Sequence, residues 1–101
     1  MQNKCTKILD FGATWCGGCK ILKENLKNYD NRVPIEYIDC DTDDDIPTKY
    51  GVRNLPTLVF LDSEDQVIKR HVGVITLIQL YDILDEIEGK QSIGSNSDRN
   101  V

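Results

Sequence analysis

Short clusters of apolar residues along the chain predict four strands. Residues 7–11 and 33–39 are mainly apolar over strand-like lengths, and one acid interrupts the first cluster. Residues 58–61 are continuously apolar, as expected of a strand that is covered on both faces. Residues 67–72 follow a polar turn at 62–66 and alternate like a hairpin partner. We therefore expect the strand at 58–61 to be central in the sheet.

The segments between and after these strands carry helical signals. From Lys20 onward, lysines alternate with apolar side chains that recur at helical spacing, namely Ile21, Leu22, Leu26 and Tyr29. Residues 47–50 suit a short helix that Gly51 ends. Residues 76–88 form the clearest helix, which Thr76 can cap and Gly89 ends. Because helices between strands imply right-handed crossovers, the predicted fold is α/β, a central mixed sheet flanked by helices in the order β-α-β-α-β-β-α.

Length and composition limit the chain to one small domain. Its 101 residues, of which 40% are hydrophobic, suffice for a single core. Polar and small residues dominate from Lys90, so we expect residues 1–89 to form the domain and residues 90–101 to be a disordered tail. The formal net charge of -5 argues against a phosphate-binding surface, and hence against direct binding of nucleic acid.

The beginning of the chain carries neither a secretion signal nor a membrane span. The apolar cluster at 8–11 follows the polar first residues directly and is too short for either. We therefore expect a soluble cytoplasmic protein that makes no membrane contact. Because thiols stay reduced in that compartment, the four cysteines indicate redox chemistry or a metal site rather than a disulfide scaffold.

Cys16 and Cys19 are the candidate reactive groups. Cys16 stands where a helix is expected to begin, and the unpaired N–H groups and the dipole of a helix N-terminus favour a thiolate there. We expect Cys16 to attack a target disulfide as nucleophile, and Cys19, one turn later, to resolve the mixed disulfide. Gly17 and Gly18 between them have no side chains, so a substrate chain can approach closely.

Three motifs follow one another along the chain. Asp10-Phe11 lies on the first strand, Trp-Cys-Gly-Gly-Cys-Lys at 15–20 opens the first helix, and Tyr-Gly-Val-Arg-Asn-Leu-Pro-Thr at 50–57 precedes the central strand. In order and spacing these motifs resemble those of the thioredoxin family, and Gly73 after the hairpin matches the family pattern as well. The resemblance covers about residues 8–87.

The resemblance implies roles for residues around the cysteine pair. Pro56 should follow a cis peptide bond and face the cysteines, so that the backbone of Leu55 pairs with an extended substrate segment. Asp10 should be a buried acid whose raised pKa allows it to accept the proton of Cys19. An apolar rim that contacts partners should be formed by Trp15, Gly73 and Val74.

The resemblance also implies an activity and its partners. The chain should be a protein-disulfide reductase that transfers electrons from its dithiol to disulfide-containing target proteins. An NADPH-dependent thioredoxin reductase should then reduce it again; the chain should work as a monomer, with no cofactor besides the redox-active Cys16–Cys19 pair. One alternative is a thioredoxin-like binding or assembly subunit whose surface is used rather than its thiols. Another, an oxidase or isomerase, is opposed by the missing export signal and by the resemblance to cytosolic reductants.

The chain departs from the family pattern at several positions. Gly18 replaces the usual proline, which predicts a looser turn and a more oxidising redox potential. Gly12 stands where an aromatic residue is usual, and Tyr37 stands about where a lysine partner of the buried acid is common. Only nine residues precede Asp10, too few for the family's usual N-terminal strand and helix. We therefore expect a trimmed version of the fold, which would suit a phage or a compact bacterial source.

Simpler interpretations remain for several of these residues. Cys16 and Cys19 are half of a zinc site in one alternative, but Cys5, Cys40 and His71 lack the spacing of further ligands. Cys5 and Cys40 are better interpreted as packed thiols, with a regulatory disulfide between them as the alternative.

Asp10, Pro56 and the acidic segment at 39–45 also have plain alternatives. In the plain interpretation, Asp10 is a partly exposed acid at the end of a strand and Pro56 is an ordinary trans proline in a loop. The resemblance favours the functional interpretation of both residues. The acidic segment resembles a calcium loop but lacks a glycine at its sixth position and has Tyr50 in place of an acid at its twelfth. We expect a solvated acidic loop there.

Overall fold

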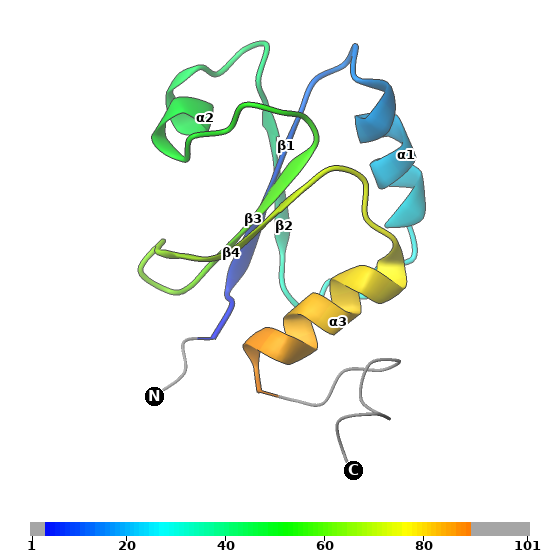
Figure 1. The fold of residues 1–101 in the computed structure, drawn as a ribbon, viewed down its shortest axis with the longest axis vertical. Helices are drawn as coiled ribbons and strands as arrows, with labels where there is room; N and C mark the ends of the chain where they lie inside the picture. Colours follow the sequence, from blue (N-terminus) through cyan, green and yellow to red (C-terminus); the bar gives the residue numbers. More distant parts are fainter. Residues whose placement is uncertain (1–3, 90–101) are drawn as a thin grey trace.

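The computed structural model describes residues 4–89, over which four strands and three helices form (Figure 1). The strands are β1 (Lys7–Gly12), β2 (Ile35–Asp39), β3 (Thr57–Leu61) and β4 (Val67–Val72). The helices are α1 (Gly17–Asn25), α2 (Asp45–Lys49) and α3 (Leu77–Ile87). The predicted order β-α-β-α-β-β-α is confirmed, and the described part begins just ahead of β1. The tail predicted at 90–101 lies outside the described residues.

The strands form one mixed sheet in the order β2-β1-β3-β4. β1 and β2 are parallel because α1 carries the chain back between them, whereas β1 with β3 and β3 with β4 are antiparallel. The predicted hairpin turn is held by Asp62, whose carboxylate accepts the backbone N–H groups of Glu64 and Gln66 at 2.8 and 2.9 Å. The mixed sheet predicted from the pattern is confirmed.

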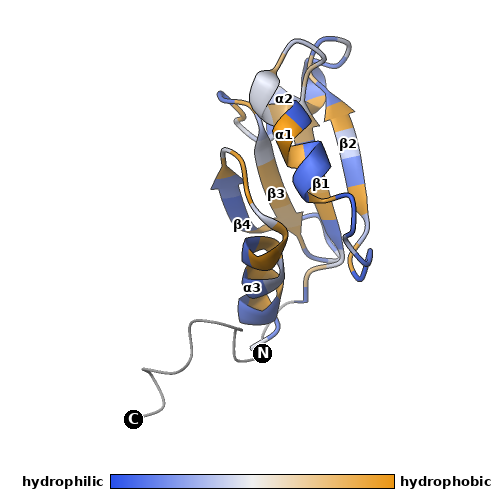
Figure 2. Ribbon diagram, turned by 90° about the vertical axis from the view of Figure 1, so that its right-hand side faces the viewer, coloured by the Kyte–Doolittle hydropathy of each residue, from blue (hydrophilic) through white to orange (hydrophobic). Residues whose placement is uncertain are grey.

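Helices cover both faces of the sheet and make two cores. α1 and α3 lie on one face, and α2 lies on the other (Figure 1). The larger core, on the α1 and α3 side, contains Ile8, Leu22, Phe60 and Leu80, and the smaller one contains Leu9, Phe11, Ile38 and Val59. All five residues of β3 are buried, as predicted for the central strand, whereas β4 is a largely exposed edge strand with hydrophilic residues in its middle (Figure 2).

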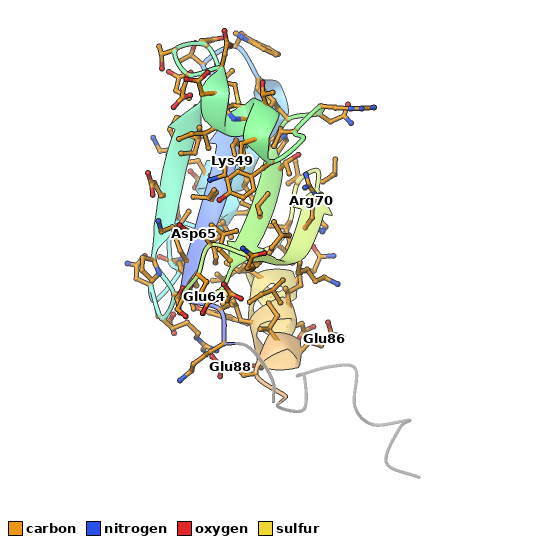
Figure 3. The ribbon with its side chains drawn as sticks, turned by 90° about the vertical axis from the view of Figure 1, so that its left-hand side faces the viewer. Lys49, Glu64, Asp65, Arg70, Glu86 and Glu88 are labelled. Carbon is orange, nitrogen blue, oxygen red and sulfur yellow. A yellow bond between two sulfur atoms is a disulfide. The ribbon has the colours of Figure 1, made fainter. Side chains whose placement is uncertain are left out.

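A side chain of the edge strand β4 forms a hydrogen bond with the end of α2. Arg70 on β4 donates a hydrogen bond of 2.6 Å to the backbone carbonyl of Tyr50, the residue that ends α2 (Figure 3). The ring of Tyr50 packs against Phe11 at a centroid distance of 6.1 Å. These contacts anchor the start of the loop that leads to Pro56.

Several element boundaries differ from the sequence-based prediction. α1 ends at Asn25, so Tyr29 lies beyond the helix. There the hydroxyl of Tyr29 accepts the N–H of Val33 and donates to the carbonyl of Val33. Ile21 is 55% exposed, because it is about 100° around the helix from the buried Leu22. β2 begins after Pro34, which has no N–H for the sheet.

The two later helices follow their sequence signals more closely. α2 starts at Asp45, two residues earlier than predicted, because proline fits the first turn of a helix. α3 is confirmed with Thr76 as its cap: the hydroxyl accepts the N–H of Gln79, and the Gln79 side chain accepts the N–H of Thr76. None of the helices between residues 4 and 89 is long and apolar enough to cross a membrane.

Candidate active site

The two cysteines lie at the edge of the sheet where β1 and β2 both end. Because these strands are parallel, their carboxyl ends meet at one edge, at the top of Figure 1. β1 ends at Gly12, and a loop of four residues leads into α1. The N-terminus of α1 is thus placed at the end of the sheet, above the last residues of β1.

Cys16 is the N-cap of α1, and its sulfur does what a serine or aspartate oxygen usually does at that position. Its backbone is extended, and Sγ accepts a hydrogen bond of 3.1 Å from the backbone N–H of Cys19. The two cysteines form a disulfide with a Cα–Cα distance of 5.3 Å. The structure therefore confirms that the pair lies at the helix start, as the sequence predicts.

Exposure alone does not separate the two cysteines by role. Cys16 is only 7% exposed in the disulfide state, and Cys19 is somewhat more accessible. The two differ in their surroundings, because Cys16 lies at the positive end of the helix and Cys19 faces the end of β1. A Cβ atom built on Gly12 would lie 3.1 Å from Sγ of Cys19.

Asp10 lies on the face of β1 that is turned toward α1. Side chains alternate along a strand, so Asp10 shares this face with Ile8 and Gly12, whereas Leu9 and Phe11 point into the core on the α2 side. Leu9 and Phe11, although next to Asp10 in the sequence, therefore lie on the opposite face of the strand from it. Burial is nevertheless substantial, and it raises the pKa of Asp10 from 3.8 to about 6. An ordinary exposed strand-end acid does not fit this environment.

A cleft of about 590 Å³ connects Asp10 with Cys19. It is lined by Asp10, Ala13, Thr14, Cys19, Lys20, Lys23 and Tyr37. The sequence analysis named Tyr37 only as a departure from the family pattern near the buried acid, and it did not single out Lys23. The structure adds the reason that Tyr37 faces the cleft, because Tyr37 is the direct partner of Asp10 in the parallel register of β1 and β2.

Gly18, between the two cysteines, lies next to Pro56 and Val74. The Leu55–Pro56 bond is cis, as the resemblance implied. A Cβ atom on Gly18 would lie 3.2 Å from Cδ of Pro56 and 3.4 Å from Cγ2 of Val74, so a side chain there would press on both. A Cβ atom on Gly17 would meet nothing within 4 Å. The two glycines of the motif therefore have different surroundings.

The backbone around Pro56 is tied to the segment after β4. Gly73 donates its N–H to the carbonyl of Pro56 at 2.8 Å, with a positive φ of 103° that only glycine adopts readily. Val74 is 40% exposed beside it, and Leu55 is half-buried against the smaller core. The structure thus brings Leu55, Pro56, Gly73 and Val74 together near Gly18, with Pro56 buried and Val74 the most exposed of the four.

Trp15 forms the part of the rim nearest the acidic loop. Its ring is 70% exposed, and its indole Nε1–H donates a hydrogen bond of 2.9 Å to Oδ1 of Asp41. Asp39 and Asp43 accept backbone N–H groups of residues 41, 45 and 46, and these hydrogen bonds organise the loop. The acidic segment is thus an ordered loop beside the cysteines, with one carboxylate that orients the tryptophan.

Cys5 and Cys40 are free thiols that lie on opposite faces of the sheet. Cys5 belongs to the larger core, and Cys40 packs against the smaller one. Burial raises the pKa of both thiols. The structure therefore supports the packed-thiol interpretation of both and does not contain the alternative disulfide. Within residues 4–89, no cluster of three or more His, Cys, Asp or Glu side chains has the arrangement of a metal site.

Comparison with known proteins gives the family of this site. The Thioredoxin family model matches residues 1–86. The thioredoxin of Staphylococcus epidermidis is 38% identical over 85 residues, which cover 79% of this chain and 80% of that protein. The thioredoxin of Pseudomonas aeruginosa is 36% identical over 83 residues, which cover 77% of this chain and 75% of that protein.

Solved structures agree with this assignment. Chloroplastic thioredoxin z has a TM-score of 0.68 at 32% identity, covering 85% of this chain and 80% of its own. A mutant thioredoxin from Halobacterium salinarum has a TM-score of 0.74 at 27% identity, covering 83% of this chain and 75% of its own. The family match and the paired cysteines at the helix start lead to one conclusion. This chain belongs to the thioredoxin family of thiol–disulfide oxidoreductases.

Proposed function

We propose that this protein-disulfide reductase works in the cytoplasm as a monomer, with Cys16 as nucleophile and Cys19 as resolving thiol. Its oxidised form would be reduced by an NADPH-dependent thioredoxin reductase, and the cysteine pair would serve as the redox centre without a bound cofactor. The observation that carries the assignment of roles is the hydrogen bond from the N–H of Cys19 to Sγ of Cys16. That bond, with the helix dipole, stabilises negative charge on Cys16 in particular.

In the first step, the Cys16 thiolate attacks one sulfur of the target disulfide. A bond forms between Sγ of Cys16 and that sulfur while the target disulfide breaks, and the other target sulfur leaves as a thiolate that takes a proton from water. The chain is now joined to its target by a mixed disulfide. The position of Cys16 at the N-cap supports this assignment, because charge is stabilised there before the attack.

In the second step, Cys19 releases the target. The Cys19 thiol gives its proton to the carboxylate of Asp10, and the resulting thiolate attacks Sγ of Cys16. A Cys16–Cys19 disulfide forms while the bond between Cys16 and the target breaks, and the target sulfur leaves as a thiolate that takes a proton from water. Asp10 later returns its proton to the solvent. Asp10 suits the role because its pKa of about 6 is close to neutral, so it ionises at cellular pH yet holds a proton more readily than an exposed carboxylate.

The surface beside the disulfide is proposed to hold the target chain in an extended form. The backbone of Leu55 would pair with the target, as in strand addition. Gly17 and Gly18 would let the target backbone approach the sulfurs, and the exposed side chains of Trp15 and Val74 would contact it from either side. Specificity then comes from shape and backbone pairing near the disulfide rather than from a deep pocket.

Reduction of insulin disulfides by dithiothreitol tests the assignment. The full chain should accelerate the reaction well above the rate of dithiothreitol alone, whereas Cys16→Ser and Cys19→Ser should each abolish the acceleration. Cys19→Ser alone should accumulate a mixed disulfide with insulin chains, visible under non-reducing conditions. A mixed disulfide that forms through Cys19 in the Cys16→Ser variant instead would reverse the proposed roles. Wild-type activity no better than dithiothreitol would remove the reductase proposal.

A coupled assay tests the proposed electron donor. NADPH oxidation is followed with a bacterial thioredoxin reductase, insulin and the full chain, with the Cys16→Ser, Cys19→Ser double variant as control. Oxidation that depends on the wild-type chain supports the proposed partner. Activity with dithiothreitol but none with NADPH and the reductase would mean that another donor serves this chain.

A further inference from the structure

We propose that Tyr37 is a positioning residue whose ring shields Asp10 from water and so sets the pH range in which Cys19 can release the target. This inference rests on the proposed role of Asp10 as proton acceptor for Cys19. Tyr37 belongs to none of the three motifs, and it is brought to the site by the pairing of two strands. Three observations support the proposal.

The first observation is the register between β1 and β2. Asp10 and Tyr37 are direct partners across the parallel pair. Partners in a parallel ladder project from the same face of the sheet, with their backbones about 5 Å apart. The side chain of Tyr37 therefore stands beside that of Asp10, on the face that α1 covers. The neighbouring Glu36 projects from the other face, where it pairs with Lys7 at 3.6 Å.

The second observation is the space above Gly12. A Cβ atom on Gly12 would lie 3.0 Å from Cε1 and 3.3 Å from the hydroxyl of Tyr37, and 3.1 Å from Sγ of Cys19. The ring and the sulfur thus both border the volume that a side chain at position 12 would need. Gly12 allows the ring of Tyr37 to lean along the sheet from Asp10 toward Cys19.

The third observation is the wall of the cleft. Tyr37 lines it together with Asp10 and Cys19, while Lys20 and Lys23 line it from α1. Tyr37 is 51% exposed, so the residue borders both the cleft and the solvent. A large apolar ring at that position excludes water from the carboxylate and disfavours its charged form.

The charged groups around Asp10 do not account for its raised pKa. Lys20 and Lys23 are positive, so they would stabilise the carboxylate, in the direction opposite to burial. The pKa of Tyr37 is itself raised, by burial first and then by Asp39 and Asp10, so its hydroxyl stays protonated and neutral. Tyr37 therefore acts on Asp10 through its bulk and not through a charge.

The test separates the ring from the hydroxyl by comparing Tyr37→Ala with Tyr37→Phe in the reduced full chain. The titration of Asp10 is followed by NMR of its carboxyl carbon. The second exchange step is followed by stopped flow, as the second thionitrobenzoate released when the chain reacts with the small disulfide DTNB. Glu36→Ala is the matched control on the opposite face of β2, and Cys19→Ser gives the background from other thiols.

We expect Tyr37→Ala to lower the titration midpoint of Asp10 by about one pH unit, a tenfold change in proton affinity. The pH profile of the second step should move in the same direction, while Tyr37→Phe and Glu36→Ala should leave both measurements unchanged. Equal shifts in Tyr37→Phe and Tyr37→Ala would assign the effect to the hydroxyl and overturn the proposal. An unchanged midpoint in Tyr37→Ala would overturn it as well.

Asp10→Asn distinguishes a failure of this inference from a failure of the proposed function. If its second step keeps the wild-type pH profile, Asp10 is not the proton acceptor for Cys19. The NMR titration still decides in that case whether Tyr37 shields the carboxylate. Tyr37→Leu guards against unfolding of the alanine variant: it retains bulk without the ring and should give an intermediate shift. A wild-type midpoint in Tyr37→Leu and a lowered one in Tyr37→Phe would contradict the proposal.

Discussion

The backbone N–H of Cys19 donates a hydrogen bond of 3.1 Å to Sγ of Cys16, so one sulfur is both the helix cap and the proposed nucleophile. Stability and reactivity therefore depend on the same atom. Substitutions at position 16 can separate the two, because serine retains a capping atom and loses the thiol chemistry.

Cys16→Ser and Cys16→Ala should both be inactive in insulin reduction but differ in stability. In the Cys19→Ser background, which removes the disulfide, the serine variant should be more stable by about 1 kcal/mol, because only its side chain accepts an N–H of the first helical turn. Urea unfolding checks the difference. Equal stability of the two variants would mean that the cap contributes nothing.

Asp10→Asn should stabilise the fold at neutral pH. The folded pKa of Asp10 is about 6 and the unfolded value is 3.8, so the folded chain binds more protons in that window and loses stability as pH rises through it. Asparagine does not titrate, so its advantage should grow from nearly zero at about pH 4 to about 1–3 kcal/mol above pH 6. Urea unfolding of the variant and the wild type across this pH range measures the difference in their free energies of unfolding. A constant difference at every pH would contradict the assigned burial.

Gly17→Ala and Gly18→Ala should affect different properties, the first the stability of the fold and the second the KM for a protein target. Alanine at position 17 meets open space inside α1 and should stabilise the fold by about 0.5–1 kcal/mol. Alanine at position 18 would press on Pro56 and Val74 and should raise the KM for insulin several-fold. The rate with DTNB, which needs less of this surface, should change little in either variant. Identical KM values for the two variants would argue against the proposed target surface.

Gly18→Pro should make the cysteine pair more reducing. A stiffer turn holds the two thiols closer together in the reduced chain, and this favours the disulfide. A tenfold gain in disulfide stability lowers the potential by about 30 mV. Equilibration with glutathione buffers measures the change, with Gly17→Ala as control. A potential that rises in the proline variant would contradict the predicted effect of glycine at position 18.

Asp41→Ala should weaken the binding of protein targets, because it removes the hydrogen bond that orients Trp15. The loss of one hydrogen bond to an exposed ring should change stability by less than about 0.5 kcal/mol but raise the KM for insulin about two- to fivefold. Asp44→Ala is the control. It removes the same charge from the acidic loop, but the Asp44 side chain makes no capping hydrogen bond to α2. If both variants raise KM equally, the loop acts through its charge and not through Trp15.

Local patterns in the chain were sufficient for the elements and for part of the site. The alternation at 67–72, the apolar run at 58–61 and the capping box of Thr76 each depend on neighbouring residues, so each could be recognised without the fold. The same holds for Cys16 and Cys19, which one helical turn brings together. Tyr29 was placed on α1 wrongly because the length of the helix depends on its packing and not on periodicity alone. Ile21 was placed on the apolar face wrongly because one residue turns the helix by about 100° from the buried Leu22.

The sequence by itself determined that two cysteines stand at a helix start behind a strand that carries an acid. Only the tertiary structure decided which side chains surround that acid. Asp10 and Tyr37 are 27 positions apart, and the parallel register of β1 and β2 places them side by side. Gly12, Tyr37 and Cys19 share one small volume for the same reason, since β1, β2 and α1 converge there. A register between distant strands is set by packing of the whole sheet, and no local pattern contains it.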